Sequence, residues 1–373
     1  MYLTNANVVF PDRVERSSVF IEDGLVDRIG SGAGHELDLG GDYLIPGLID
    51  LHTDNLEKHY MPREGVDWNP VSAAAIHDGI VIDGAITTVF DSIALGVSWG
   101  KMERAEMLRP VLSGLDLAAE AKLLRADHKL HFRCEVTDDN VIRDLDAFID
   151  EPGVALLSVM DHSPGDRQYA DLEKYREKRI AWGDSTPDEV DQEIEDLLRR
   201  SREVAPVNRA RVMEMARERR LTVASHDDAS QAHIDECVEL GITISEFPTT
   251  IAAARAANEA GMQVIMGGPN LVRGGSYSGN VAAADVHAAG YLDIIASDYV
   301  PRSMLEGAFR LAAENTCQLP AAIASVTRNA AASVGMTDRG SIALGLRADL
   351  AQISITAGIP RVERVWVAGK QVR

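Results

Sequence analysis

The sequence predicts an α/β protein, namely a (β/α)₈ TIM-like barrel with a small β-sandwich domain built from both chain termini. Through the middle of the chain, eight short apolar runs alternate with helical patterns, which is typical of parallel βα units. Both ends of the chain instead contain β-rich runs separated by turn sequences. The 373 residues also fit a barrel of about 250 residues plus a small accessory domain.

The two chain ends are predicted to form one domain. Residues 1–45 and residues 340–373 have the same alternation of short strands and turns, and neither segment could bury a core alone. We therefore expect 1–45 and 340–373 to build a composite β-sandwich, and 46–339 to build the barrel.

The barrel strands are expected at the apolar runs. Three of the intervening helical patterns end at Gly84, Gly241 and Gly261, where a left-handed helix cap is favoured. The expected strands are 46–52, 86–91, 130–135, 154–161, 221–225, 242–246, 263–267 and 293–297.

A charged segment, about 166–220, interrupts the βα repeat. It contains Thr186, Pro187 and Glu189, which match an N-cap, a first-turn proline and the glutamate of a capping box. We expect a helical pair that lies over one barrel loop.

Composition indicates a soluble globular protein, with 46% hydrophobic and 25% charged residues. No apolar run reaches 18 residues and no signal peptide is evident, so we expect a cytoplasmic protein without membrane contact. The three cysteines are far apart and are expected to be reduced thiols. A net charge of −21 opposes binding to nucleic acid, and an anionic substrate would need local cations. The sequence does not determine the oligomeric state, and a homo-oligomer is one of the states it allows.

The end of the first barrel strand carries His52 and Asp54. Residues i and i+2 of a strand project to the same side, so this imidazole and this carboxylate can converge on one cation. The alternative is a loop histidine followed by an aspartate that caps the next helix.

Other strand ends favour the metal site, because all of them meet at the catalytic face of a barrel. Histidines and carboxylates together suit Zn²⁺, Mn²⁺ or Fe²⁺ better than a thiolate site would. We interpret Asp91 as a helix cap, His77 and His233 as structural, and His128 as a surface or loop residue. The remaining polar strand ends are Glu135, Asp161 with His162, His226 with Asp227 and Asp228, Glu246, and Asp298.

Basic loops near these strand ends are candidates for phosphate binding. The glycine-rich stretch 267–280 follows the seventh strand, where barrels often hold phosphate through backbone N–H groups, although it could also be a flexible connector. Arginine matches phosphate through paired, charge-assisted hydrogen bonds. The candidates are Lys58, Arg63, Arg167, Arg273, Gly274, Gly275 and Ser276.

Three segments resemble the amidohydrolase superfamily: Pro46-Gly47-Leu48-Ile49-Asp50-Leu51-His52, Ser297-Asp298 and Ala348-Asp349-Leu350. The resemblance implies the barrel, the composite β-domain and metal-dependent hydrolysis. The chain differs from the usual His-x-His by having Asp54, and the fourth strand offers no lysine for carboxylation. Glu135 would then bridge two ions, and Glu246 replaces a histidine that many relatives have.

Longer strings resemble the superfamily members that act in phosphonate degradation. This resemblance implies hydrolysis of a ribosyl 5-triphosphate that carries a phosphonate, giving the 5-phosphate and diphosphate. The strings are His52-Thr53-Asp54-Asn55-Leu56-Glu57-Lys58, Met160-Asp161-His162-Ser163-Pro164-Gly165, Ala224-Ser225-His226-Asp227-Asp228-Ala229, Glu246-Phe247-Pro248-Thr249-Thr250 and Asn270-Leu271-Val272-Arg273-Gly274-Gly275-Ser276.

The expected cofactor is one or two divalent ions, and Zn²⁺ and Mn²⁺ are the ions that the sequence favours. Asp298 is expected to be the general base, and His162 to hold the second ion or donate to a phosphoryl oxygen. The cations and Glu246 would line the pocket of a small anionic triphosphate. A C–N hydrolase (deacetylase, cyclic amidase or deaminase) and a noncatalytic barrel without metals are the alternatives. The expected metal ligands are His52, Asp54, Glu135, His162, His226 and Asp298.

Overall fold

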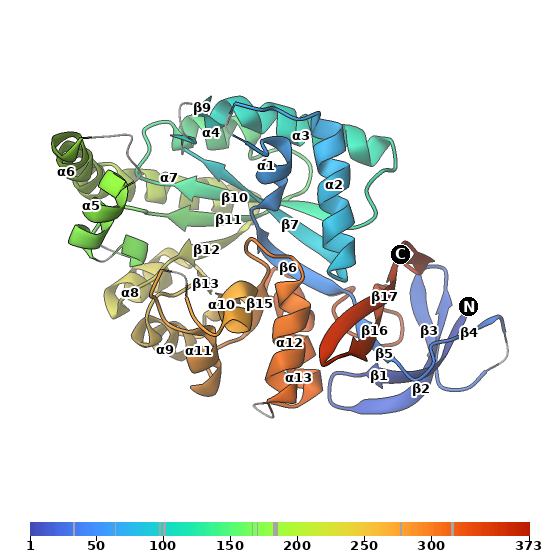
Figure 1. Ribbon diagram of the computed structural model, residues 1–373. Coiled ribbons are helices and arrows are strands. Elements are labelled where there is room, and N and C mark those ends of the chain that lie inside the picture. The colour runs from blue at the N-terminus through green and yellow to red at the C-terminus, as the bar shows by residue number, and fades with distance from the viewer. Residues whose placement is uncertain are drawn as a thin grey trace.

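The middle of the chain forms an eight-stranded parallel barrel (Figure 1). The computed structural model describes residues 1–373 except 33, 64, 97, 100, 101, 166, 170, 182–185, 277, 315 and 316. Neighbouring strands follow the order β15-β14-β13-β12-β11-β10-β7-β6, so all eight expected strands are confirmed. Their bounds are β6 (Leu48–Thr53), β7 (Ile86–Leu95), β10 (Asp127–Glu135), β11 (Val154–Met160), β12 (Thr222–His226), β13 (Ile244–Glu246), β14 (Gln263–Gly267) and β15 (Ile294–Ala296).

Backbone hydrogen bonds close the barrel between its first and last strands. Thr53 and Asp298 form a parallel bridge. The Asp298 N–H donates to the His52 carbonyl at 2.9 Å, and the Asp54 N–H donates to the Asp298 carbonyl at 3.2 Å. The closure therefore brings three of the expected metal ligands side by side at the carboxyl ends of the strands.

Strand alternation divides each strand between the barrel interior and the surrounding helices. In β10, Phe132 and Cys134 face outward and belong to the large core between strands and helices. His131, Arg133 and Glu135 therefore face the interior, toward the catalytic end of the barrel. The interior itself is filled by a separate buried cluster that includes Ile49, Leu51, Phe90, Leu156, Ala224, Ile244 and Ile265.

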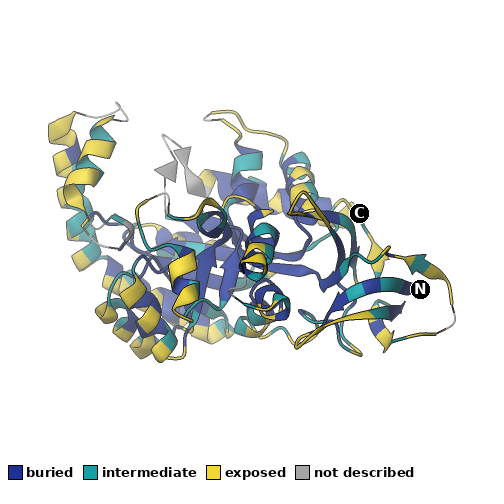
Figure 2. Cartoon of the chain, turned by 60° about the horizontal axis from the view of Figure 1, so that its bottom comes forward, coloured by how far each residue is buried: buried dark blue, intermediate teal, exposed yellow. Residues whose placement is uncertain are grey.

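Helices surround the barrel, and buried strands lie inside a shell whose outer faces are exposed (Figure 2). Left-handed backbone at Gly241 (φ +79°) and Gly261 (φ +77°) confirms two expected helix caps. The third was wrong: Gly84 has φ −81° and still lies in the last helical turn, and Ala85 (φ +65°) makes the reversal before β7. The helices of the ring are α1 (Asn55–Tyr60), α2 (Pro70–Asp83), α3 (Arg104–Glu120), α4 (Val141–Phe148), α7 (Ala205–Arg219), α8 (Gln231–Leu240), α9 (Ile251–Glu259), α10 (Gly268–Arg273), α11 (Ala283–Ala288), α12 (Ser303–Ala313), α13 (Leu319–Ala324) and α14 (Arg328–Ser333).

The expected insertion contains a helical pair, α5 (Leu172–Ala181) and α6 (Pro187–Glu203), which projects from the barrel rim (Figure 1). The capping box between Thr186 and Glu189 is present, as the sequence predicts. Two ion pairs join the helices, including Arg179 Nη2 to Glu193 Oε2 at 2.7 Å. The last part of the segment, α7, packs against α4, β11 and β12 and therefore belongs to the barrel ring.

Both chain ends contribute to one further sheet, which confirms the composite β-domain. Hydrogen bonding joins its strands continuously in the order β18-β17-β16-β5-β1-β2-β3, with β4 paired to β1. Trp366, Leu350 and Leu3 lie in its own buried core. Its exact boundaries stay a prediction. The strands are β1 (Tyr2–Val9), β2 (Val14–Glu22), β3 (Leu25–Ile29), β4 (Glu36–Asp38), β5 (Tyr43–Pro46), β16 (Leu350–Thr356), β17 (Ile359–Val367) and β18 (Lys370–Gln371).

Within the described part of the chain, no helix combines the length and the apolarity needed to cross a bilayer.

A buried polar cluster connects β7 and β10 to α2, outside the barrel interior. Asp91 accepts from His77 Nε2 and from His128 Nδ1, both at 2.7 Å, and His128 Nε2 lies 3.5 Å from Asp78 Oδ1. Two expectations were wrong here: Asp91 pairs with two imidazoles rather than capping a helix, and the His128 side chain is only 7% exposed. Asp91 faces outward from β7 and so reaches His77 and His128, and spacing along the sequence does not show these contacts.

This cluster is expected to make stability depend on pH. Burial alone would lower the pKa of His128, but Asp91 and Asp78 outweigh it and raise that pKa to about 9. Stability from His128 is therefore fully present below its unfolded pKa of about 6.5 and is lost as pH rises through about 9. We expect His128→Gln to lower the free energy of unfolding by on the order of 3 kcal/mol at pH 6, with a much smaller loss at pH 10.

Urea unfolding across this pH range measures the effect, with the exposed His35→Gln as the control variant. A loss in His128→Gln that is the same at pH 6 and pH 10 would contradict the charged pairing.

Candidate active site

Glu246 lies between two histidines at the carboxyl ends of the barrel strands. His52 Nδ1 is 2.8 Å from Glu246 Oε1, and His226 Nδ1 is 2.7 Å from Glu246 Oε2. All three side chains are buried, and their ligand atoms are close enough to hold one cation. The sequence analysis places Glu246 on the substrate side, which stays a prediction, and its position between the two imidazoles also makes it a candidate metal ligand.

A second group shares His226 with the first. His226 Nε2 is 3.5 Å from Asp227 Oδ2, and His162 Nε2 is 3.7 Å from the same oxygen. His162 Nδ1 lies 2.7 Å from Glu135 Oε2. His162, His226 and Asp227 could therefore hold another cation.

The protonation states of His52 and His226 suit metal binding. Burial lowers the pKa of His226 to about 3 and lowers the pKa of His52 well below its usual range, so both imidazoles are neutral at pH 7. Burial would also lower the pKa of His162, but the hydrogen bond to Glu135 outweighs it and raises that pKa. Neutral imidazole is the form that ligates a metal.

The residues present fit a divalent cation. Three buried atoms of these groups, His52 Nδ1, Glu246 Oε1 and Asp227 Oδ2, form no hydrogen bond of proper geometry with any described residue, although the first two lie only 2.8 Å apart. An unsatisfied buried polar atom costs about 1–3 kcal/mol, and a cation bound by these lone pairs would remove that cost. Imidazole nitrogens with carboxylate oxygens are ligands that Zn²⁺ and Mn²⁺ accept.

Asp298 and Asp54 stand beside the two groups. Burial, with a contribution from the charge of Asp54, raises the pKa of Asp298 to about 7. Asp54 Oδ1 accepts from Lys58 Nζ at 2.8 Å, and its side chain is 27% exposed. Glu135 is bonded to His162 and also accepts from Thr137 Oγ1 at 2.6 Å. The structure thus gathers the six expected ligands at one face, and their roles stay predictions.

Left-handed backbone recurs where strands end in the site. Asp227, Phe247 and Asp298, which follow β12, β13 and β15, have φ values of +56°, +56° and +55°. Each donates its N–H to a neighbouring strand, and the Asp227 N–H bonds the Glu246 carbonyl at 2.9 Å. Such backbone costs about 1–3 kcal/mol per residue and concentrates at functional sites. The strand pairing therefore holds these side chains in place.

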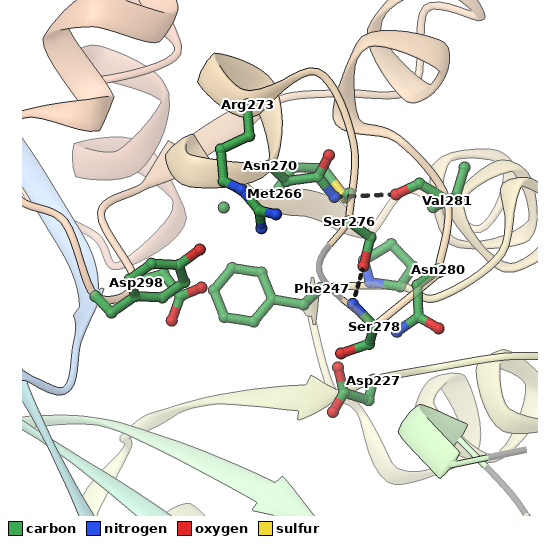
Figure 3. Close-up of a pocket in the computed structure, with 13 residues that line it drawn as sticks. Asp227, Phe247, Met266, Asn270, Arg273, Ser276, Ser278, Asn280, Val281 and Asp298 are labelled. Atoms are coloured by element: carbon green, nitrogen blue, oxygen red, sulfur yellow. Dashed lines mark hydrogen bonds between the residues drawn. The ribbon is translucent and has the colours of Figure 1, made fainter. Parts of the chain in front are cut away.

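A cavity of about 270 Å³ opens beside Asp227 and Asp298 (Figure 3). Arg273 and Ser276 line its opposite side, and Phe247 lies between them and Asp298. The expected glycine-rich loop begins differently from the prediction. Its first residues are not a loop, because the six-residue helix α10 follows β14 directly. This helix ends at Arg273 and is capped by Gly274 (φ +81°).

The other candidate cations occupy different surroundings. Arg167 is buried, and its Nη1 donates to Asp228 Oδ1 at 2.9 Å and to the His226 carbonyl at 3.1 Å. This places Arg167 beneath the strand end as a structural partner of Asp228. Lys58 reaches the edge of the cavity, with Nζ 5.9 Å from the Tyr299 ring centre. Arg63 is exposed and is not among the described residues that line this cavity.

Arg133 is a site residue that the sequence interpretation missed. It faces the barrel interior two positions before Glu135, and its buried Nε has no hydrogen-bond partner among the described residues. Its charge acts on Asp298 and Asp227, lowering the pKa of each against the larger effect of burial. The period-two spacing of His131, Arg133 and Glu135 was the available signal.

The site consists of histidines and carboxylates at the strand ends of a parallel barrel, and a family comparison identifies the class of protein to which this arrangement belongs. A model described as the amidohydrolase family matches residues 136–373. Together with the relative described next, this match shows that the chain belongs to the amidohydrolase family.

Particular relatives narrow the comparison. Alpha-D-ribose 1-methylphosphonate 5-triphosphate diphosphatase from Escherichia coli (strain K12) is 39% identical over 377 residues, covering 100% of both chains. Among solved structures, 5-methylcytosine deaminase from Klebsiella pneumoniae has a TM-score of 0.65 at 15% identity, covering 100% of this chain and 98% of that one. N-acetylglucosamine-6-phosphate deacetylase from Pasteurella multocida has a TM-score of 0.62 at 13% identity, covering 99% and 98%. Both structures share the fold.

We expect the purified protein to bind one or two divalent ions per chain. His226→Ala should lose metal from both groups, because His226 belongs to each of them. His287→Ala, on α11, is the control and should keep its metal. Elemental analysis gives the stoichiometry, and activity is measured after chelation and after addition of Zn²⁺ or Mn²⁺. If the purified protein contains no metal and its activity does not change when Zn²⁺ or Mn²⁺ is added, the proposed metal site would be contradicted.

Proposed function

We propose that this protein hydrolyses α-D-ribose 1-methylphosphonate 5-triphosphate to the 5-phosphate and diphosphate. The observation that carries the proposal is the 39% identity, over the full length of both chains, to the Escherichia coli diphosphatase. The site supports it, because Arg273 faces Asp298 and Asp227 across a cavity at the candidate metal groups. A guanidinium is suited to a phosphate chain.

His52, His226 and Glu246 would hold one ion, with His162, Asp227 and Glu135 contributing to a second. A bound divalent ion would acidify water and polarise a phosphoryl oxygen. Zinc and manganese are the ions we propose, since the donors are imidazoles and carboxylates.

The chain's own residues would bind the triphosphate, orient it and move a proton. Phosphoryl transfer needs mainly positioning and charge stabilisation. Arg273 would bind the phosphates that leave as diphosphate, and Arg133 would place positive charge within the carboxylate cluster. Asp298 Oδ would accept the proton of the attacking water, since it borders both the cavity and the metal groups.

The alternative is C–N bond hydrolysis at the same strand ends. Imidazolonepropionase from Ruegeria sp. (strain TM1040) is 27% identical, covering 84% of this chain and 78% of that protein. The substrate named in imidazolonepropionase carries no phosphate for Arg273 to bind, so the cavity favours the diphosphatase over that reaction. For location we propose the cytoplasm, where the described thiols Cys134, Cys237 and Cys317 would stay reduced, in keeping with their unpaired state.

Asp298→Asn should keep the fold and most of the metal but lose at least about a hundredfold in kcat, the scale of a lost general base. The amide is similar in shape and cannot take the proton. Steady-state kinetics on variant protein of measured metal content test this role. If the folded, metal-loaded Asp298→Asn variant has a near-normal kcat, Asp298 is not the general base.

Arg273→Ala should lower kcat/KM for the ribosyl triphosphate by roughly 10- to 150-fold, because one charge-assisted phosphate contact is worth about 1.5–3 kcal/mol. Arg255→Ala, which removes an exposed arginine of α9, is the matched control. Diphosphate release is measured for wild type and both variants. Equal rates in wild type and Arg273→Ala would exclude Arg273 as a triphosphate ligand. Wild-type protein that releases no diphosphate but hydrolyses cyclic amides would replace the proposed function by the C–N alternative.

A further inference from the structure

A second cavity, of about 410 Å³, is lined by His162, whereas the cavity of Arg273 is lined by Asp227. Glu135 and His162 form its wall at the candidate metal groups. The opposite wall comes from the inserted helical pair, which presents Lys178 and Arg179 from α5 and Arg200 from α6. The insertion therefore brings three cations to a hollow that adjoins the catalytic residues.

Acidic and aromatic side chains contact the basic residues Arg179 and Lys178 in this cavity. Arg179 Nη2 pairs with Glu193 Oε2 at 2.7 Å, and Glu193 also accepts from the Tyr175 hydroxyl at 3.3 Å. Lys178 Nζ lies 5.9 Å from the Tyr169 ring centre. Glu193 is thus paired within the wall, and Arg200 is paired with Asp139 at 3.2 Å and Asp196 at 2.8 Å. The carboxylates of Asp138 and Glu135 also line the cavity, so its cationic, hydroxyl-rich side is the one formed by Lys178, Arg179 and the tyrosines. Such a lining suits a phosphonate or phosphate group.

The two cavities meet at the candidate metal groups. Asp227 lines the first cavity, His162 lines the second, and only 3.7 Å separates Asp227 Oδ2 from His162 Nε2. The first cavity, at 270 Å³, is smaller than the roughly 300–1,000 Å³ of usual ligand pockets. A substrate with an anionic group at each end would extend through both cavities and pass the metal groups in its middle.

We propose that the cavity lined by α5 and α6 is an anion subsite that receives the phosphonate end of the substrate. This inference rests on the proposed function. The triphosphate end then occupies the cavity of Arg273, and the scissile anhydride lies at the junction. The insertion thereby selects for a ribosyl triphosphate that bears a second anionic group on its sugar.

The test compares two substrates, ribose 1-methylphosphonate 5-triphosphate and ribose 5-triphosphate, through the ratio of their kcat/KM values. Wild type should favour the phosphonate-bearing substrate. Lys178→Met should lower the ratio about tenfold, the scale of one lost charge-assisted contact. Lys178→Arg should restore most of it. Lys174→Met, on the same helix with a side chain that is 82% exposed, is the matched control and should keep the wild-type ratio.

A ratio that stays at the wild-type value in both Lys178→Met and Arg179→Met overturns the subsite, as does a wild type that hydrolyses both substrates equally well. Calorimetric titration with methylphosphonate separates this result from failure of the proposed function. If wild type releases diphosphate from neither substrate, the diphosphatase proposal fails. Methylphosphonate binding that Lys178→Met abolishes and Lys174→Met retains would still support the subsite, and absence of that binding would overturn it.

Discussion

The bond network that joins the first barrel strand to the last determines where the catalytic groups stand. The Asp298 N–H bonds the His52 carbonyl, the Asp54 N–H bonds the Asp298 carbonyl, and the Ser297 N–H bonds Asp50 Oδ1 at 3.0 Å. Residues about 250 positions apart become neighbours through these contacts. Because the strands are parallel, closure turns every strand end toward the same face, and each polar residue there becomes a potential ligand.

That convergence has an electrostatic consequence. Carboxylates and neutral imidazoles gather in a buried site, and several of their atoms lack partners among the described residues. Burial raises the pKa of Asp227 to about 6 and of Asp298 to about 7, because the charged carboxylate is poorly solvated there, and a bound cation would favour the charged form of each. Arg133, facing the interior from β10, offsets part of the excess negative charge. The −21 net charge of the chain is therefore compatible with an anionic substrate, because the charges that matter are local.

The outer face of the barrel has a different polar arrangement. Asp91, between His77 and His128, has partners for both carboxylate oxygens. Burial alone would raise the pKa of Asp91, but the two imidazoles lower it to about 2. The two clusters contain similar residue types. In the outer cluster both oxygens of Asp91 are paired, and His77 Nδ1 is a buried atom without a hydrogen-bond partner among the described residues. The outer cluster lies between β7, β10 and α2, away from the two cavities at the strand ends, so we expect it to contribute to stability, whereas the inner groups lie beside those cavities.

The sequence alone determined the eight strands, the composite β-domain and the residues at the strand ends, because apolar period and turn composition are local properties. It also singled out His52, His162, His226 and Asp298 as candidate ligands, since each stands at the end of an apolar run, and their roles stay predictions. Only the tertiary structure decided that Glu246 lies between two histidines, that Arg167 is paired to Asp228, and that Arg133 enters the site. These placements are contacts between side chains on different strands. They depend on strand pairing and on side-chain packing, which the spacing of residues along the sequence does not determine.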